Sequence, residues 1–149
     1  MILVIDDFIK DKGLLKEISQ DVNFFNDPGI YYWWDGWWNG EAKTVKHRLI
    51  EAIWADNCPL TQPMSIRGFE YWTGIQTANT ETGFSNNLGN HYDKDEELFA
   101  KTGEIVIPSM GTVYYPEQDK FEGGMLEIYT EGVDKKPEVV YAKPNRLII

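Results

Sequence analysis

Four short segments in the second half of the sequence favour β-strands and limit the folds that this chain can adopt. They are rich in β-branched and aromatic residues and are separated by Gly, Pro and Asp. Their sequences are EIVIP (104–108), GTVYY (111–115), MLEIYTEG (125–132) and EVVYAKPNRLII (138–149). Short strands at such regular spacing predict an antiparallel sandwich or barrel.

The first half of the sequence has the apolar spacing of two amphipathic helices, over residues 12–22 and 41–56. Before them, MILVIDDFIKDK is expected to form a first strand or the entry to a helix, because Asp6 and Asp7 interrupt its apolar run and no basic region precedes it. A chain of 149 residues fits one domain of ordinary size. We therefore expect a single domain over residues 1–149, of the α+β class and mainly β.

Charge and composition exclude several classes of protein. The net charge is −10 and no stretch forms a basic stripe, so the chain lacks the electrostatic term that dominates binding to nucleic acids. For the same reason an anionic membrane surface is not an expected partner. The one cysteine, Cys58, excludes an internal disulfide framework, and no apolar run approaches the roughly 18 residues of a membrane span. We expect a soluble, cytoplasmic protein.

Aromatic residues are concentrated in YYWWDGWWNG, residues 31–40, which two turn signals interrupt. Two interpretations of this segment stand side by side. Trp33, Trp34, Trp37 and Trp38 could form a hydrophobic plug between the helices and the sheet, or an exposed wall that holds a ligand.

His91 and Asp93, in NHYDKDEELF (90–99), form a candidate metal site. In a β-strand, residues i and i+2 point to the same face, so the pair would bring an imidazole nitrogen and a carboxylate oxygen to one spot. That is two-thirds of the 2-His-1-carboxylate triad of non-haem Fe(II) oxygenases. Without context, a solvated acidic loop is the commoner explanation of such a short pattern.

Calcium is a second candidate ligand for this segment. Asp93, Asp95, Glu97 and Glu104 occupy positions 1, 3, 5 and 12 of an EF-hand-like loop. The sixth position, where the loop needs glycine, is Leu98, and no helix is predicted before the loop. The sequence therefore disfavours calcium.

Two further segments give the His-x-Asp pair a context. NHYDKDE (90–96), GTVYYPEQDKFEGGMLEIYTEG (111–132) and VVYAKPNRLII (139–149) together resemble the prolyl 4-hydroxylase-like family of 2-oxoglutarate- and Fe(II)-dependent dioxygenases. The resemblance covers roughly residues 66–149. It implies a double-stranded β-helix core, that is, a cupin-like jelly roll, preceded by N-terminal helices and with its last strands missing.

The resemblance also implies an activity and its residues. His91 and Asp93 would be the first two Fe(II) ligands, Tyr115 would contact 2-oxoglutarate, and Leu88 would line the site. With O2 as co-substrate, such an enzyme hydroxylates a C–H bond of its substrate. A peptide is the expected substrate, with a prolyl residue as the family's best-known target, and a small molecule is the other choice.

The resemblance bears on four further residues. Gly123 and Gly124 open a strand, where the absence of Cβ atoms lets the backbone bulge or approach closely, although a simple hairpin turn explains them as well. Tyr71 and Trp72, in GFEYW (68–72), would either line the pocket from a neighbouring strand or, as we favour, pack in the core.

The sequence departs from the family pattern at its end. The family's second histidine ligand, and the basic residue that pairs with 2-oxoglutarate, follow the strand in which this chain ends at Ile149. His47 is no substitute in our interpretation, since it is expected to face solvent beside Glu51 on the predicted helix. We expect either a fragment or a natural short form whose last strand exposes an edge and forms a homodimer through it.

Two non-enzymatic functions remain open. A β-fold with an incomplete metal site could be a binding module, for instance for carbohydrate, in which the aromatic rings stack on sugars. It could also be a structural component whose strand edge docks a partner chain.

Overall fold

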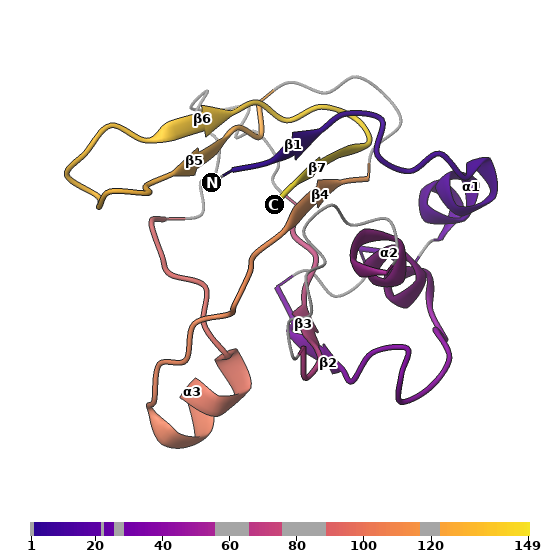
Figure 1. Cartoon of the computed structure of the whole chain (residues 1–149), viewed down its shortest axis with the longest axis horizontal. Helices are drawn as coiled ribbons and strands as arrows, with labels where there is room; N and C mark the ends of the chain where they lie inside the picture. The colour runs from indigo at the N-terminus through magenta and orange to yellow at the C-terminus, as the bar shows by residue number, and fades with distance from the viewer. Residues whose placement is uncertain (1, 22, 26–28, 56–65, 76–88, 117–122) are drawn as a thin grey trace, which may run out of the picture. The chain divides into compact units, whose positions relative to one another are not determined.

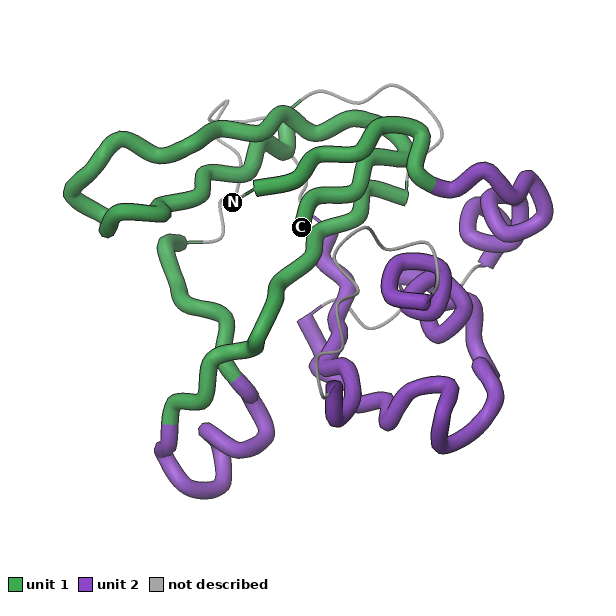
Figure 2. The backbone as a smooth tube through the Cα atoms, viewed as in Figure 1, with its two compact units in different colours: residues 1–8, 76–94, 105–149 green, residues 9–75, 95–104 purple. Residues whose placement is uncertain are grey.

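A computed structural model describes residues 2–21, 23–25, 29–55, 66–75, 89–116 and 123–149 (Figure 1). The chain divides into two compact units (Figure 2). Unit 1 comprises residues 1–8, 76–94 and 105–149, and unit 2 comprises residues 9–75 and 95–104. Each unit is described by itself below.

The central element of unit 1 is a three-stranded antiparallel sheet (Figure 1). Its strands are β1 (Val4–Ile5), β7 (Arg146–Ile148) and β4 (Val113–Tyr115), in the order β1-β7-β4. Leu147 lies opposite Ile5 on one side and opposite Tyr114 on the other. The first and the last strand of the chain are therefore neighbours.

Strand β7 has no open edge, because both of its hydrogen-bonding edges are paired. Leu147 is fully buried and Ile148 is only 3% exposed. The prediction that the C-terminal strand exposes an edge is therefore wrong. The reason is that β1, more than 140 residues earlier in the chain, covers one edge and β4 covers the other.

A second pair of strands in unit 1 joins β5 (Leu126–Ile128) to β6 (Glu138–Val140), also antiparallel. The segment 138–149, which the sequence grouped as one block, forms two strands, β6 and β7. Between them Asn145 has a φ of 54°. Asparagine tolerates this left-handed conformation better than most residues, so the chain can turn at Asn145 just before β7 begins.

The predicted strand at EIVIP (104–108) is absent from the structure, which gives these residues no regular element. Ile105 and Ile107 are 64% and 68% exposed. β-propensity stabilises a strand only when a neighbouring strand completes the hydrogen bonds and covers one face. None of the strands in the described ranges pairs with this segment.

Unit 2 contains helices α1 (Lys12–Gln20) and α2 (Val45–Trp54), which confirm the two predicted helices and pack against each other. Asp11 caps α1 by accepting from the N–H groups of Gly13 and Leu14, and Thr44 caps α2. Their apolar faces form most of the core of this unit. Its buried side chains are Ile9, Ile18, Phe24, Trp34, Leu49, Ile50, Ile53 and Trp54.

A two-stranded antiparallel sheet in unit 2 pairs β2 (Tyr32–Trp34) with β3 (Phe69–Tyr71). Trp33 lies directly opposite Glu70, while the rings of Tyr32 and Tyr71 stack with centroids 5.7 Å apart. Since neighbouring residues in a strand point to opposite faces, these two pairs define the two faces of the sheet.

Helix α3 (Glu96–Thr102) was not predicted, since its residues were interpreted as a charged loop. Asp95 caps it through a 2.7 Å hydrogen bond from the Leu98 N–H, and Gly103 ends it with a φ of 73°. An aspartate before the helix and a glycine after it are the usual end signals. These signals were present in the sequence.

The observed fold is an α+β mixture of three helices and small antiparallel sheets within the described residues, which confirms the α+β class. The prediction that the fold is mainly β is wrong for these residues, because the helices contain more residues than the short strands. No helix among these residues is long and apolar enough to cross a bilayer.

Candidate functional site

His91 and Asp93 lie in unit 1, in a segment before α3 that has no regular secondary structure. Both are exposed, at 53% and 65% of their side chains. The Nδ1 atom of His91 is 2.8 Å from the carbonyl oxygen of Gly89, two residues earlier. A local turn, instead of the predicted strand, brings the two side chains to the same place.

This hydrogen bond sets the tautomer of the His91 ring. A carbonyl oxygen only accepts, so Nδ1 must carry the proton, and in the neutral ring the lone pair is then on Nε2. That Nε2 atom is 3.5 Å from Oδ1 of Asp93. Two electron-pair donors therefore face each other, an arrangement that a shared cation stabilises.

Two strand ends of the same unit flank the pair. A Cβ atom on Gly111, just before β4, would lie 3.3 Å from Oδ2 of Asp93, so a side chain there would crowd the carboxylate. Asn90, beside His91, hydrogen-bonds the Tyr129 hydroxyl after β5. The ends of β4 and β5 thus border the His91–Asp93 segment.

Tyr115, the predicted 2-oxoglutarate contact, is the last residue of β4 and donates its hydroxyl to the carbonyl oxygen of Gly124 at 2.9 Å. Gly123 and Gly124 have φ values of 82° and 69°, which explains glycine at both positions. Tyr114 donates to Oδ1 of Asn145 at 2.8 Å. As expected for neighbours in a strand, the two tyrosines have different partners.

Opposite Tyr115 in the sheet lies Arg146 of β7. Its guanidinium binds Oδ1 of Asp6 at 2.6 Å, and Lys143 binds Oδ2 of the same carboxylate at 2.8 Å. These two cations hold the pKa of Asp6 well below its usual range, with the Arg146 hydrogen bond as the largest cause. The triad of Asp6, Lys143 and Arg146 ties the end of β1 to β7.

Leu88, the fourth predicted site residue, lies outside the described residues. Among those that are described, no group of three or more His, Cys, Asp or Glu side chains is arranged to hold a metal ion. The calcium alternative loses two of its ligands to helix α3, since Asp95 caps that helix and Glu97 pairs with Lys101. Of the three iron ligands that the resemblance implies, the structure describes two, His91 and Asp93.

His47, on α2 of unit 2, does not face solvent beside Glu51 as predicted. Its ring stacks on Trp34, with centroids 4.5 Å apart and planes 2° apart, and Nε2 lies 3.0 Å from the Tyr71 hydroxyl. The prediction was wrong because the buried face of α2 is wider than assumed. Ile50 and Trp54, three and seven residues after His47, are also buried and mark that face.

The surroundings of His47 disfavour its protonated form. Burial lowers the pKa of His47 below its ordinary value of 6.5, and Lys43 lowers it further. Its Nδ1 atom is buried and has no hydrogen-bond partner among the residues that the structure describes. Burying such an atom costs stability, so this histidine is a sensitive point of unit 2.

The tryptophan-rich segment combines both predicted roles. Trp34 is buried in the core, and Trp37 is half-buried against Phe69. Trp33 and Trp38 are 49% and 44% exposed. The first pair is therefore part of a hydrophobic plug, and the second pair is available for contact with a ligand.

Tyr71 and Trp72 follow the same division. Tyr71 is half-buried, and burial raises the pKa of its hydroxyl. Trp72 is 37% exposed and its ring lies 5.9 Å from that of Tyr31.

Comparison with known proteins gives no match to a family model, a curated protein or a solved structure. The functional assignment therefore rests on the residues themselves.

Proposed function

We propose that this chain carries part of the iron site of a 2-oxoglutarate- and Fe(II)-dependent dioxygenase that hydroxylates a prolyl or other peptidyl substrate. The observation that carries the proposal is the geometry of His91, whose Nε2 lone pair faces the Asp93 carboxylate.

The separation of these two donor atoms suits a shared metal ion. Adjacent ligands of one octahedral ion, each at about 2.1 Å, are roughly 3 Å apart. The observed 3.5 Å between Nε2 and Oδ1 needs only a small side-chain rotation to reach that value. The Gly89 carbonyl supports the ring from the far nitrogen, as outer-shell partners of metal-binding histidines commonly do.

The pairing of two neighbouring strands supports the proposal. Tyr115 ends β4, and Arg146 begins β7 opposite it. The antiparallel pairs β4–β7 and β5–β6 are compatible with a double-stranded β-helix, which we propose as the finer description of unit 1.

The proposed chemistry divides between the ligands and the protein. Bound Fe(II) and 2-oxoglutarate would activate O2 for the oxidation of a C–H bond. The protein would contribute the orientation of His91, the negative charge of Asp93 beside the metal, and a hydroxyl from Tyr115 near 2-oxoglutarate.

A metal titration tests the iron site without requiring activity. Mn(II), which is stable to air, is titrated against the purified chain with and without 2-oxoglutarate and followed by electron paramagnetic resonance. We expect saturable binding, and Asp93→Ala should weaken it by at least about tenfold, since even outer-shell changes commonly cost 10–100-fold. Asp134→Ala, which removes another exposed carboxylate of unit 1, is the matched control. Equal affinity of native chain and Asp93→Ala would refute the site.

A tyrosine pair tests the 2-oxoglutarate contact separately. Tyr115→Phe should weaken 2-oxoglutarate binding in the presence of Mn(II) and leave Mn(II) binding alone unchanged. Tyr114→Phe removes a hydroxyl that is bonded to Asn145 and should change neither. An unchanged affinity for 2-oxoglutarate in Tyr115→Phe would remove this residue from the proposal.

A non-catalytic binding module is the second candidate, favoured by the exposed rings of Trp33, Trp38 and Trp72. It predicts binding of a ligand that does not depend on metal.

A further inference from the structure

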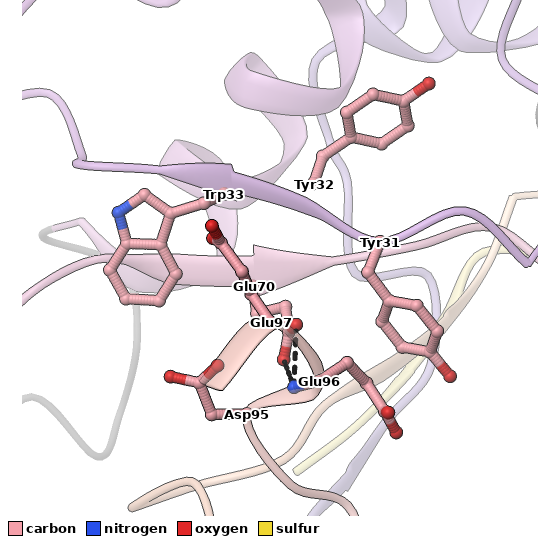
Figure 3. A pocket seen from close by; sticks show the side chains of 7 residues that line it. All are labelled: Tyr31, Tyr32, Trp33, Glu70, Asp95, Glu96 and Glu97. Carbon is pink, nitrogen blue, oxygen red and sulfur yellow. Dashed lines mark hydrogen bonds between the residues drawn. The ribbon is translucent and has the colours of Figure 1, made fainter. Parts of the chain in front are cut away.

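Unit 2 has an open hollow of about 490 Å³ beside the β2–β3 sheet (Figure 3). Three aromatic and four acidic residues line it. These residues are Tyr31, Tyr32, Trp33, Glu70, Asp95, Glu96 and Glu97.

The register of β2 and β3 determines which side chains share the hollow. Trp33 and Glu70 are directly opposite each other, so their side chains point to the same face of the sheet. Tyr31 lies two residues before Trp33, and Figure 3 shows its ring on the side of the sheet where Glu70 lies. Tyr32 points to the opposite face, where Lys46 lies over its ring.

The aromatic wall is held in place. The Trp33 indole donates a 2.7 Å hydrogen bond from Nε1 to Asp35. A Cβ atom on Gly68 would lie 2.3 Å from the indole, so only glycine lets the ring lie there. Even so, Trp33 is 49% and Tyr31 is 44% exposed. Fixed but exposed rings bind with little loss of conformational entropy.

The carboxylate of Glu70 is also held in place. Both of its oxygens accept from the backbone N–H of Glu96, at 3.1 and 3.3 Å (Figure 3). Burial raises the pKa of Glu70, and the nearby charges of Asp95 and Glu96 add to this effect. Among the residues that the structure describes, no lysine or arginine forms an ion pair with Glu70 or Asp95.

We propose that this hollow binds an alkylammonium group, as a free amine or as the lysine side chain of a peptide. Tyr31 and Trp33 both line the hollow, so a cation bound there would lie beside aromatic side chains as well as carboxylates. The carboxylate opposite Trp33 supplies the matching charge. A hydrated metal ion would gain less from the aromatic rings than an alkylammonium group, and a neutral sugar would leave the charges of Glu70 and Asp95 unmatched.

The test uses the intact chain and follows the Trp33 indole N–H signal by NMR, assigned with Trp33→Leu. Tetramethylammonium chloride and Nα-acetyl-lysine amide, which keeps its side-chain ammonium group, are titrated at constant ionic strength. CaCl2 is titrated as the metal probe. We expect saturable shifts with both amines. The amine that binds more tightly identifies the source of the group: lysine derivative for a peptide, tetramethylammonium for a free quaternary amine.

Matched variants separate the site from general attraction to an acidic protein. Glu70→Gln keeps an oxygen that can accept from Glu96, removes the charge, and should weaken amine binding about fivefold. Glu131→Gln removes one exposed carboxylate of unit 1 and should have no effect. Trp33→Leu should weaken binding, measured by calorimetry, about threefold, whereas Trp38→Leu, outside the hollow, should not.

Three results would overturn the inference. They are the absence of a saturable shift, an equal effect of Glu131→Gln and Glu70→Gln, and a Ca²⁺ response that matches the amine response. If Trp33→Leu fails to fold by circular dichroism, the comparison of Glu70→Gln with Glu131→Gln decides alone. This inference is independent of the proposed dioxygenase activity, because none of its probes or variants involves Mn(II), 2-oxoglutarate or the His91–Asp93 pair.

Discussion

Replacing Leu147 with alanine tests whether β7 is the central strand of unit 1. Leu147 is fully buried, with Ile5 opposite it on β1 and Tyr114 opposite it on β4. Paired neighbours on both sides restrict collapse around the missing methyl groups. A buried Leu→Ala change of this kind costs about 3–5 kcal/mol of unfolding free energy, through lost transfer free energy and the cavity left behind.

The assay is urea unfolding followed by far-UV circular dichroism, with thermal unfolding as a second measurement. At about 2–4 °C per kcal/mol for a chain of this size, the melting temperature of Leu147→Ala should fall by about 6–20 °C. All six tryptophans lie between residues 33 and 72, within unit 2, so their fluorescence reports on that unit separately. Coincident urea transitions by circular dichroism and by tryptophan fluorescence would show that the units unfold together.

Val139→Ala on β6 is the control. It also shortens an aliphatic side chain in a strand, but at a position that is 40% exposed. Its expected cost is about 1 kcal/mol or less. If Leu147→Ala costs no more than Val139→Ala, β7 is not buried between two strands, and the sheet order argued above is wrong.

Three further predictions concern charge, pH and capping. Asp6→Asn should destabilise the chain at pH 7 by about 1 kcal/mol after solvent screening, since it breaks the bonds from Lys143 and Arg146. Because the pKa of Asp6 is lowered in the folded state, its contribution is present above the ordinary value of 3.8 and is lost as the pH falls further, so native and variant stabilities should converge in acid. His47→Phe keeps a stacked ring but removes a group whose pKa is lowered by folding, so urea unfolding between pH 7 and 5 should show a steeper loss of stability in the native chain than in the variant; equal slopes would contradict this. Thr44→Ala removes the oxygen that accepts from the His47 N–H and should cost about 1 kcal/mol, which Thr44→Ser should restore in part.

Local patterns were sufficient to predict the elements whose signals lie within a few residues. Helices α1 and α2 follow from apolar residues at helical spacing, and β4 and β5 follow from short β-branched and aromatic runs between turn residues. Helix α3 could also have been predicted from Asp95 and Gly103, but the acidic residues between them were given more weight than the capping signals.

The candidate site was predictable in part for the same reason. His91 and Asp93 are close in sequence, so even a turn can bring them within 3.5 Å. The partner of the His91 ring, the carbonyl of Gly89, could not be predicted, because a backbone oxygen has no sequence signature. The hollow beside β2 and β3 depends on the register that places Glu70 opposite Trp33, which are 37 positions apart in the sequence.

The sequence by itself determined the α+β class, the positions of the two larger helices and the pairing of one histidine with one aspartate, because these depend on contacts between near neighbours. Only the tertiary structure decided that β7 lies between β1 and β4, that His47 stacks on Trp34, and that residues 104–108 form no strand. The physical reason is that strand pairing and the width of a buried face depend on segments far away in the chain. A local pattern typical of a strand or of a solvent-facing residue therefore predicts the structure only where those distant segments provide the pairing or the exposure that it assumes.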